Sequence, residues 1–223
     1  MENQSRKLFF KPVFLGQCII KYQVPLDIFT SINTIYENNV HKLKPANVQL
    51  VGKIEKEYSL FYQGKDQTKM KNHNFLPKNV YQWFMDIYHH YLDWNKIQNY
   101  KINLNSVWVN EMKQHEYNPV HVHQGTLYTG LSSVMILKLP KNYGVEYSAS
   151  DKPQNGKLQL LGSASGQFSK VDYQPNLKER DFYVFPYDMR HTVYPFNSTD
   201  EVRRTLAANC DVDYNPIINR GAE

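Results

Sequence analysis

The sequence has few cysteines and no long apolar segment. Only Cys18 and Cys210 are present among 223 residues, and they form no Cys-x-x-Cys pair. This composition argues against a disulfide-stabilised scaffold and a cysteine-based zinc site, and it favours reduced thiols in a reducing compartment. No apolar run is long enough for a transmembrane helix, and Met1 to Phe10 lacks the pattern of a signal peptide. We therefore expect a cytoplasmic protein with no membrane partner.

A strong excess of charge is also missing. The formal net charge is +5, and the lysines are scattered, with the densest group around Lys65, Lys69 and Lys71. A small excess without an uninterrupted basic block makes nucleic acid an unfavoured partner. The hydrophobic content of 41% and aromatic content of 14% are those of a folded globular protein. The length fits one domain with a substantial core.

The sequence does have three histidines in a metal-binding pattern. His121 and His123 form a His-x-His pair, and His191 follows Phe185-Pro186 much later. In a strand, residues i and i+2 share one face and lie roughly 7 Å apart, which is close enough to share one ion. Imidazole is a common ligand of iron, zinc and copper, and three protein ligands with open positions are typical of a catalytic site. We therefore predict a metal site at these histidines.

A polar strand face follows the third histidine. Alternation places Arg203, Thr205, Ala207 and Asn209 on one face, and puts Arg204 on the opposite face. The first face combines polar groups with one small residue, as in the lining of a cavity. A buried guanidinium is costly unless a carboxylate meets it, and its fork geometry suits a bidentate carboxylate. We predict that Arg203 faces inward, and Arg204 would take this role if the register differs by one residue.

Several segments, in this order, carry a resemblance to a known family. They are Trp108 to Asn110, Tyr117 to His123, Ser132 to Pro140, Asp181 to Pro186 leading into His191, and Arg203 to Thr205. From Ser106 to Asp211 the chain resembles the Fe(II)/2-oxoglutarate-dependent oxygenases, most closely the prolyl-hydroxylase-like branch and its bacterial and viral relatives. The resemblance implies a double-stranded β-helix.

The resemblance also implies a role for each site residue. His121 would be the first iron ligand and His191 the distal one, and Arg203 would hold the far carboxylate of 2-oxoglutarate with help from Thr205 and a lesser contact from Asn110. No catalytic residue beyond the metal ligands is implied.

His123 departs from the family pattern, because most members have Asp or Glu at this position. A neutral imidazole leaves the metal more cationic than a carboxylate does. Glu116 and Asp188 are the alternative carboxylate ligands.

The activity implied by the resemblance is that of a dioxygenase. Fe(II) would be the cofactor, and 2-oxoglutarate and O2 would be consumed as a substrate is hydroxylated, with release of succinate and CO2. The substrate is unidentified. A peptidyl residue such as proline, in a protein or peptide, is the first expectation, and a nucleic acid is less favoured. Two alternatives remain open: a non-catalytic, cupin-like binding module, and a three-histidine iron dioxygenase that does not use 2-oxoglutarate. Four aromatic residues are available to wall the cavity: Tyr128, Tyr183, Phe185 and Tyr187.

Periodicity along the chain predicts a mainly β (α+β) fold with flanking helices. Helices are expected at Leu26 to Val40, where Leu26, Phe29, Ile32, Tyr36 and Val40 form one stripe, and from Pro77 to Leu92. Strands are expected at Leu8 to Phe14, Gln17 to Tyr22, Asn47 to Ser59, Ile102 to Met112, Val120 to His123, Val134 to Leu139, Val145 to Tyr147, Leu158 to Leu161, Phe182 to Phe185, His191 to Tyr194 and Arg203 to Val212.

Two helices followed by many short strands favour a jelly-roll, cupin-like barrel that the N-terminal helices buttress. We expect one oxygenase domain over residues 1–223. Residues 1–100 would supply N-terminal strands and supporting helices, and residues 101–215 would form the core. Gly144 to Phe168, rich in glycine, serine and polar residues, would be a variable insert over the cavity mouth.

Overall fold

The computed structural model describes residues 16–46, 52–64, 71–147, 149, 151–163, 166–167 and 169–214. The strand expected at Leu8 to Phe14 lies outside these residues. The elements, in chain order, are β1 (Ile20–Gln23), α1 (Leu26–Asn39), β2 (Lys44–Pro45), β3 (Lys56–Tyr62), β4 (His73–Asn74), α2 (Lys78–Trp94), β5 (Tyr100–Met112), β6 (Asn118–His121), β7 (Gly130–Lys138), β8 (Leu158–Leu161), β9 (Asp172–Tyr173), β10 (Asp181–Pro186), β11 (Arg190–Val193) and β12 (Arg203–Tyr214).

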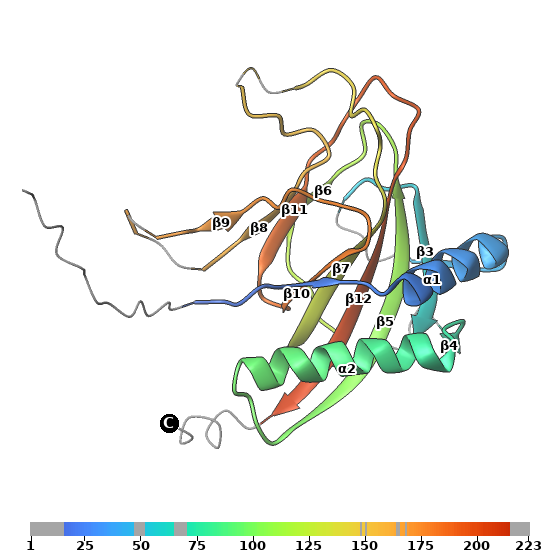
Figure 1. Ribbon diagram of the computed structural model, residues 1–223, viewed down its shortest axis with the longest axis vertical. Coiled ribbons are helices and arrows are strands. Elements are labelled where there is room, and N and C mark those ends of the chain that lie inside the picture. Colours follow the sequence, from blue (N-terminus) through green and yellow to red (C-terminus); the bar gives the residue numbers. More distant parts are fainter. Residues whose placement is uncertain are drawn as a thin grey trace, which may run out of the picture.

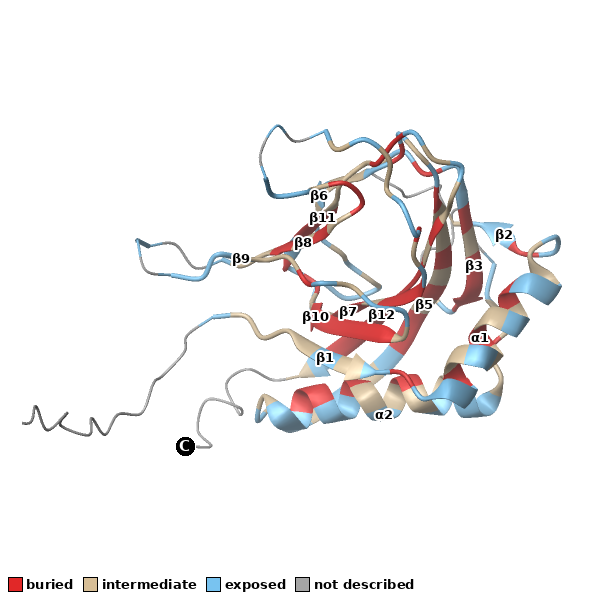
Figure 2. Ribbon diagram, turned by 45° about the horizontal axis from the view of Figure 1, so that its top comes forward, coloured by how far each residue is buried: buried red, intermediate tan, exposed pale blue. Residues whose placement is uncertain are grey.

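The strands form two antiparallel sheets. The larger sheet has eight strands in the order β1-β10-β7-β12-β5-β3-β2, with β4 beside β3, and the smaller sheet has the order β6-β11-β8-β9. Figure 2 shows the smaller sheet facing one side of the larger sheet, while both helices cover the other side. The predicted mainly β fold with helices supporting one sheet, a double-stranded β-helix, is confirmed.

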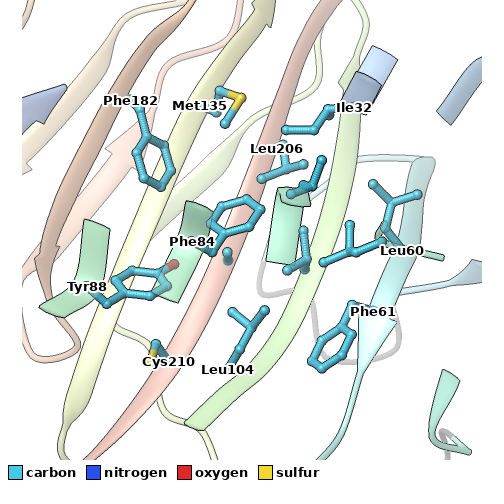
Figure 3. Close-up of a cluster of buried hydrophobic side chains, with 14 of the residues drawn as sticks. Ile32, Leu60, Phe61, Phe84, Tyr88, Leu104, Met135, Phe182, Leu206 and Cys210 are labelled. Carbon is cyan, nitrogen blue, oxygen red and sulfur yellow. The ribbon is translucent and has the colours of Figure 1, made fainter. Parts of the chain in front are cut away.

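The two helices bury apolar stripes against the larger sheet (Figure 1). Each begins directly after a proline, Pro25 or Pro77, whose fixed φ suits a helix start. Figure 3 shows the centre of this core, where Phe84 and Tyr88 of α2 lie among side chains of the sheet. Phe84 is fully buried and contacts Phe182 edge to face, with ring centroids 5.8 Å apart. This core lies between the two helices and the larger sheet.

Strand β12 separates this core from a second interior. Its even-numbered residues Leu206, Ala208, Cys210 and Val212 are buried in the helix-side core. Its odd-numbered residues Arg203, Thr205, Ala207 and Asn209 line a cavity on the side of the smaller sheet. The period of two in the sequence therefore predicts correctly which residues face each layer.

Most predicted strands differ from the structure by one to four residues at an end, and three differ more. The segment predicted from Asn47 to Ser59 forms a strand only from Lys56 and continues to Tyr62; residues 47–51 lie outside the described part. The strand predicted at Val120 to His123 instead spans Asn118–His121, because the His123 N–H leaves the ladder and donates to the Tyr187 carbonyl.

The strand predicted at Val145 to Tyr147 is wrong, since this segment is a loop. The Val145 N–H donates to the side-chain oxygen of Asn197, and the Tyr147 N–H donates to that of Asn155. Side-chain amides thus accept the hydrogen bonds that a neighbouring strand would otherwise accept. The hydrophobic pattern of the segment does not predict such contacts.

Candidate metal and cosubstrate site

Strand pairing and one loop bring the three predicted histidines together. His121 of β6 lies directly opposite His191 of β11, and their ring centroids are 4.2 Å apart. His123, just beyond β6, lies with its ring centroid 5.1 Å from that of His121 and 4.9 Å from that of His191. The potential ligand atoms of all three residues lie within 4.8 Å of one another.

Hydrogen bonds to the backbone orient two of these rings. His121 Nδ1 lies 2.7 Å from the Pro119 carbonyl oxygen, and His191 Nδ1 lies 3.1 Å from that of Met189. Because a carbonyl can only accept, each Nδ1 donates and each Nε2 keeps its lone pair. His123 Nε2 lies 3.1 Å from His191 Nε2. Two nitrogens bound side by side to one ion at about 2.1 Å lie about 3 Å apart, so the cluster fits a metal.

Burial keeps the three imidazoles neutral. It lowers the pKa of His121 and lowers that of His191 to about 3, where the neighbouring His121 contributes further. Burial, with the charges of the other two histidines, holds the pKa of His123 well below its usual range. A metal binds the neutral imidazole, so the cluster is in its ligand form at neutral pH.

Residues of β12 contact the side chain of His123 and the loop that follows it. Asn209 Nδ2 lies 3.4 Å from His123 Nδ1, and the Asn209 side-chain oxygen accepts a hydrogen bond of 3.0 Å from the Ser132 hydroxyl. Asp211 accepts hydrogen bonds from the Thr126 N–H and the Tyr187 hydroxyl, which ties the loop after His123 to β12. Such outer contacts fix the orientation of metal-binding histidines.

Arg203 is buried at the cavity, and no described residue gives it a charged partner. Its side chain has no ion pair among the described residues, and its Nε and Nη2 atoms have no hydrogen-bond partner there. Burial lowers its pKa, and the Tyr143 hydroxyl, which accepts a hydrogen bond from the guanidinium, opposes this shift. A buried guanidinium with two unused donors is an unsatisfied binding group for an anion.

Tyr143 was not predicted from the sequence. It lies in the polar segment after β7 and packs edge to face on Phe196, with ring centroids 5.5 Å apart. Gly156 has a φ of +66°, and a Cβ there would strike the Tyr143 ring. A single tyrosine in a loop without hydrophobic periodicity cannot be identified as a site residue from the sequence. The contact with the Tyr143 ring explains why residue 156 is a glycine.

The cavity has a volume of about 520 Å³ and joins the histidines to Arg203. Asn110 of β5 and Thr205 of β12 are directly opposite each other and both line it. Among the described residues that line the cavity, Arg203 is the only permanent cation. Neutral imidazoles around one ion and an unpaired guanidinium in the same cavity fit a small dicarboxylate with one end on the metal and the other on Arg203.

The structure gives the alternative residues other contacts. Arg204 lies on the opposite face of β12, where it binds Glu111 at 2.7 Å and Glu37 at 3.2 Å. Glu116 accepts hydrogen bonds from the N–H groups of Glu55 and Lys113, and Asp188 is exposed and accepts one from Gln17. Neither of these two carboxylates belongs to the histidine cluster.

Of the four aromatic residues predicted to wall the cavity, only Phe185 lines it. Phe185 lines the cavity and packs edge to face on His191, with ring centroids 4.9 Å apart. Tyr128 is 87% exposed, and Tyr183 packs in a small core with Leu158 and Leu160. Trp108, which was not predicted as part of the wall, lines the cavity with its ring centroid 5.9 Å from that of His123.

Comparisons with known proteins agree with this geometry. Residues 106–209 match the model of a family described as "Putative 2OG-Fe(II) oxygenase". No curated protein matches the sequence. No helix among the described residues has the length and apolar character needed to cross a membrane.

Three solved structures share the fold at 11% sequence identity. A prolyl-4-hydroxylase from Pseudomonas putida has a TM-score of 0.53, with 86% of this chain and 91% of that chain covered. A 2OG-Fe(II) oxygenase-family oxidoreductase from Burkholderia pseudomallei has a TM-score of 0.52, with 86% and 84% covered. A Trichoplax adhaerens prolyl hydroxylase, in complex with a hypoxia inducible factor peptide fragment, has a TM-score of 0.50, with 93% and 87% covered.

The fold, the family match and the three-histidine cluster agree. Residues 106–209, just under half of the chain, are similar to the Fe(II)- and 2-oxoglutarate-dependent oxygenases, and the three-histidine cluster fits the cofactor Fe(II) and the cosubstrate 2-oxoglutarate of that family.

Proposed function

We propose that this protein is a dioxygenase that hydroxylates a C–H bond of an organic substrate. The observation that carries the proposal is the unpaired, buried Arg203 in the same cavity as three neutral histidines. The overall reaction converts the substrate, 2-oxoglutarate and O2 into the hydroxylated product, succinate and CO2. We also propose that residues 1–223 form one domain and work in a reducing compartment such as the cytoplasm, where Cys18 and Cys210 stay free and iron stays ferrous.

Separate groups of residues would bind the metal and the cosubstrate. His121, His123 and His191 would hold Fe(II), and Arg203, with Thr205 and Asn110, would hold the far carboxylate of 2-oxoglutarate. When bound, the metal and the cosubstrate together activate O2 for insertion into a C–H bond. The protein's own contribution is to orient the two carboxylates of the cosubstrate and to shield the site with apolar groups such as Phe185.

The first substrate class to test is a peptidyl side chain such as proline. The fold shared with prolyl hydroxylases supports this choice. Val120 and Val122, which flank the metal-binding histidines in sequence, are 51% and 53% exposed. These exposed apolar side chains offer contacts for an extended peptide at the rim of the site.

The proposed reaction is tested with purified protein loaded anaerobically with Fe(II). Binding of 2-oxoglutarate is measured by calorimetry, and succinate is then measured after O2 is admitted with a proline-containing peptide library. We expect binding that requires the metal, and succinate that is absent in His191→Ala. Failure of the metal-loaded protein to bind 2-oxoglutarate would favour the cupin-like module. O2 consumption that needs no 2-oxoglutarate would favour the other three-histidine dioxygenase.

A further inference from the structure

A second buried charge lies in the same cavity as Arg203. Glu57 of β3 is 4% exposed and is the only carboxylate among the described residues that line the cavity. It lies opposite Asn110 of β5, which in turn lies opposite Thr205 of β12. These three side chains therefore form one row across neighbouring strands, and all three line the cavity.

Glu57 has no cationic partner among the residues that the structure describes. Its carboxylate accepts a hydrogen bond from the Trp108 indole, and no described lysine or arginine forms an ion pair with it. The backbone of β12, which carries Arg203, is two strands away, about 10 Å at the usual strand spacing. Burial raises the pKa of the Glu57 carboxyl to about 7. Because burial removes water from the ionised carboxylate, a cation that binds next to it stabilises the charged form.

We infer that Glu57 binds a positively charged group of the substrate, a protonated amine or a guanidinium. This rests on the proposed function, in which the cosubstrate carboxylates take the metal and Arg203. Glu57 repels those carboxylates and attracts a cation, so the part of the cavity next to Glu57 favours a positive charge.

The position of Glu57 places the cation close to the metal site. Trp108 donates to Glu57, and its ring centroid is 5.9 Å from that of His123, so one indole ring separates the carboxylate from the histidine cluster. The target C–H bond would therefore lie only a few bonds from the cationic group. In a peptide, lysine or arginine side chains meet this requirement.

The competing explanation is that Glu57 only orients Trp108. The two explanations differ in ligand selectivity, because a carboxylate that merely fixes an indole ring does not distinguish a charged ligand from a neutral one of the same shape. The other groups that face Glu57 from β5 and β12 are Asn110 and Thr205, which are uncharged. Arg203 is the only permanent charge elsewhere in the described lining.

The test uses two matched pairs of small ligands. Nα-acetyl lysine amide is compared with its 2-aminoheptanoic analogue, in which a methyl group replaces the ammonium, and Nα-acetyl arginine amide is compared with the citrulline analogue. Binding to the Zn(II)- and 2-oxoglutarate-loaded protein is measured by NMR titration at about pH 8. We expect at least one cationic ligand to bind about tenfold more tightly than its neutral partner.

Glu57→Gln should reduce this preference to less than about twofold. Glu55→Gln is the matched control, since it makes the same chemical change at a 67% exposed carboxylate paired with Lys113; it should keep the preference. In the wild-type protein, the preference should also rise about fivefold, from about twofold at about pH 6 to about tenfold at about pH 8, as Glu57 ionises. This arm remains informative if Glu57→Gln does not fold.

Equal binding within both pairs, or no binding of either cation up to about 10 mM, would overturn the inference. Its failure is distinguishable from failure of the proposed function, because the ligand pairs are measured with Zn(II) and without turnover. Succinate formation without a preference for cations removes this inference alone. A preference for cations without metal-dependent binding of 2-oxoglutarate removes the proposed reaction alone.

Discussion

At the scale of single residues, strand parity separates two neighbouring arginines. Arg203 and Arg204 are adjacent, yet one faces the cavity and the other pairs with Glu111 on the helix side. The sequence predicts this because polar and small residues alternate with larger apolar residues along β12. Glu57 and Tyr143 could not be predicted in this way. Their significance depends on which distant side chains surround them.

This parity leads to a prediction about cosubstrate binding. Arg203→Ala should weaken binding of 2-oxoglutarate about 100-fold while the metal stays bound, because only the carboxylate partner is lost. Arg204→Ala is the matched control and should change this affinity by less than about twofold, while costing about 1 kcal/mol of stability through its partly buried ion pair. Calorimetric titration of 2-oxoglutarate into the Zn(II)-loaded protein measures the affinity of both variants. The reverse ranking of the two variants would show that Arg204 is the ligand.

Glu57 should make stability depend on pH. Its folded pKa of about 7 is above the unfolded value of 4.5, so the folded state holds the proton more tightly. Stability is therefore lost as pH rises from about 4.5 to about 7, by up to about 3 kcal/mol. Glu57→Gln removes this loss, so the variant should gain stability relative to wild type between pH 5 and pH 8.

Urea unfolding of the wild type and of Glu57→Gln at pH 5 and at pH 8 measures the difference in stability between the two proteins. The histidine cluster has the opposite dependence, because its lowered pKa values make folding less favourable as pH falls below about 6.5. That contribution is common to both proteins and cancels in the comparison. A stability difference that does not change with pH would mean that Glu57 is not held in a low-dielectric site.

At the scale of elements, strong periodicity predicted structure well. The helical stripe that contains Ile32 and Tyr36 became α1, and Leu158 to Leu161 became β8 with unchanged bounds. The predictions failed where pairing depends on partners far away in the chain. The two-residue strands β2, β4 and β9 are too short to show a period, and the Val145 loop is held by side-chain amides.

Helix α2 packs on the face of the larger sheet opposite the histidines. A substitution in its core should therefore change the stability of the protein but not its metal affinity. Phe84→Ala should cost about 3–5 kcal/mol, because the fully buried ring leaves a cavity between α2 and the sheet. The metal affinity of the protein that remains folded should be unchanged, since Phe84 lies on the opposite face of the sheet from the histidines. Gln82→Ala on the exposed face of α2 is the control and should cost less than about 0.5 kcal/mol.

Chemical denaturation and metal titration of both α2 variants check this separation. A Phe84→Ala protein that keeps its stability would contradict the assigned core. A large loss of metal affinity in its folded fraction would show that the helix layer and the site are coupled.

At the scale of the whole molecule, one sheet joins the N-terminal and C-terminal parts of the chain. Strands β1 and β3 pair with β10 and β5, so segments from the first sixty or so residues complete the sheet that carries Arg203. The family match covers only residues 106–209. Sequence similarity therefore identifies the centre of the fold, whereas Glu57 comes from a strand outside the matched segment.

This shared sheet predicts cooperative unfolding. We expect a single transition, with the same midpoint by circular dichroism and tryptophan fluorescence, because β1 and β3 are hydrogen-bonded into the same sheet as β10 and β5. Binding of Zn(II) should raise the stability by about 2.7 kcal/mol when the free ion is at roughly one hundred times its Kd. Two separate transitions would instead indicate that residues 1–100 and 101–215 unfold as independent units.

The proposed metal site is tested by anaerobic calorimetric titration of Fe(II) into the wild-type protein and into His191→Ala. We expect one ion per chain for the wild type and no measurable binding for the variant, because two imidazoles alone leave the site incomplete. A folded wild-type protein that takes up no ferrous iron, or a variant that binds it equally well, would contradict the assignment of the three histidines to one metal.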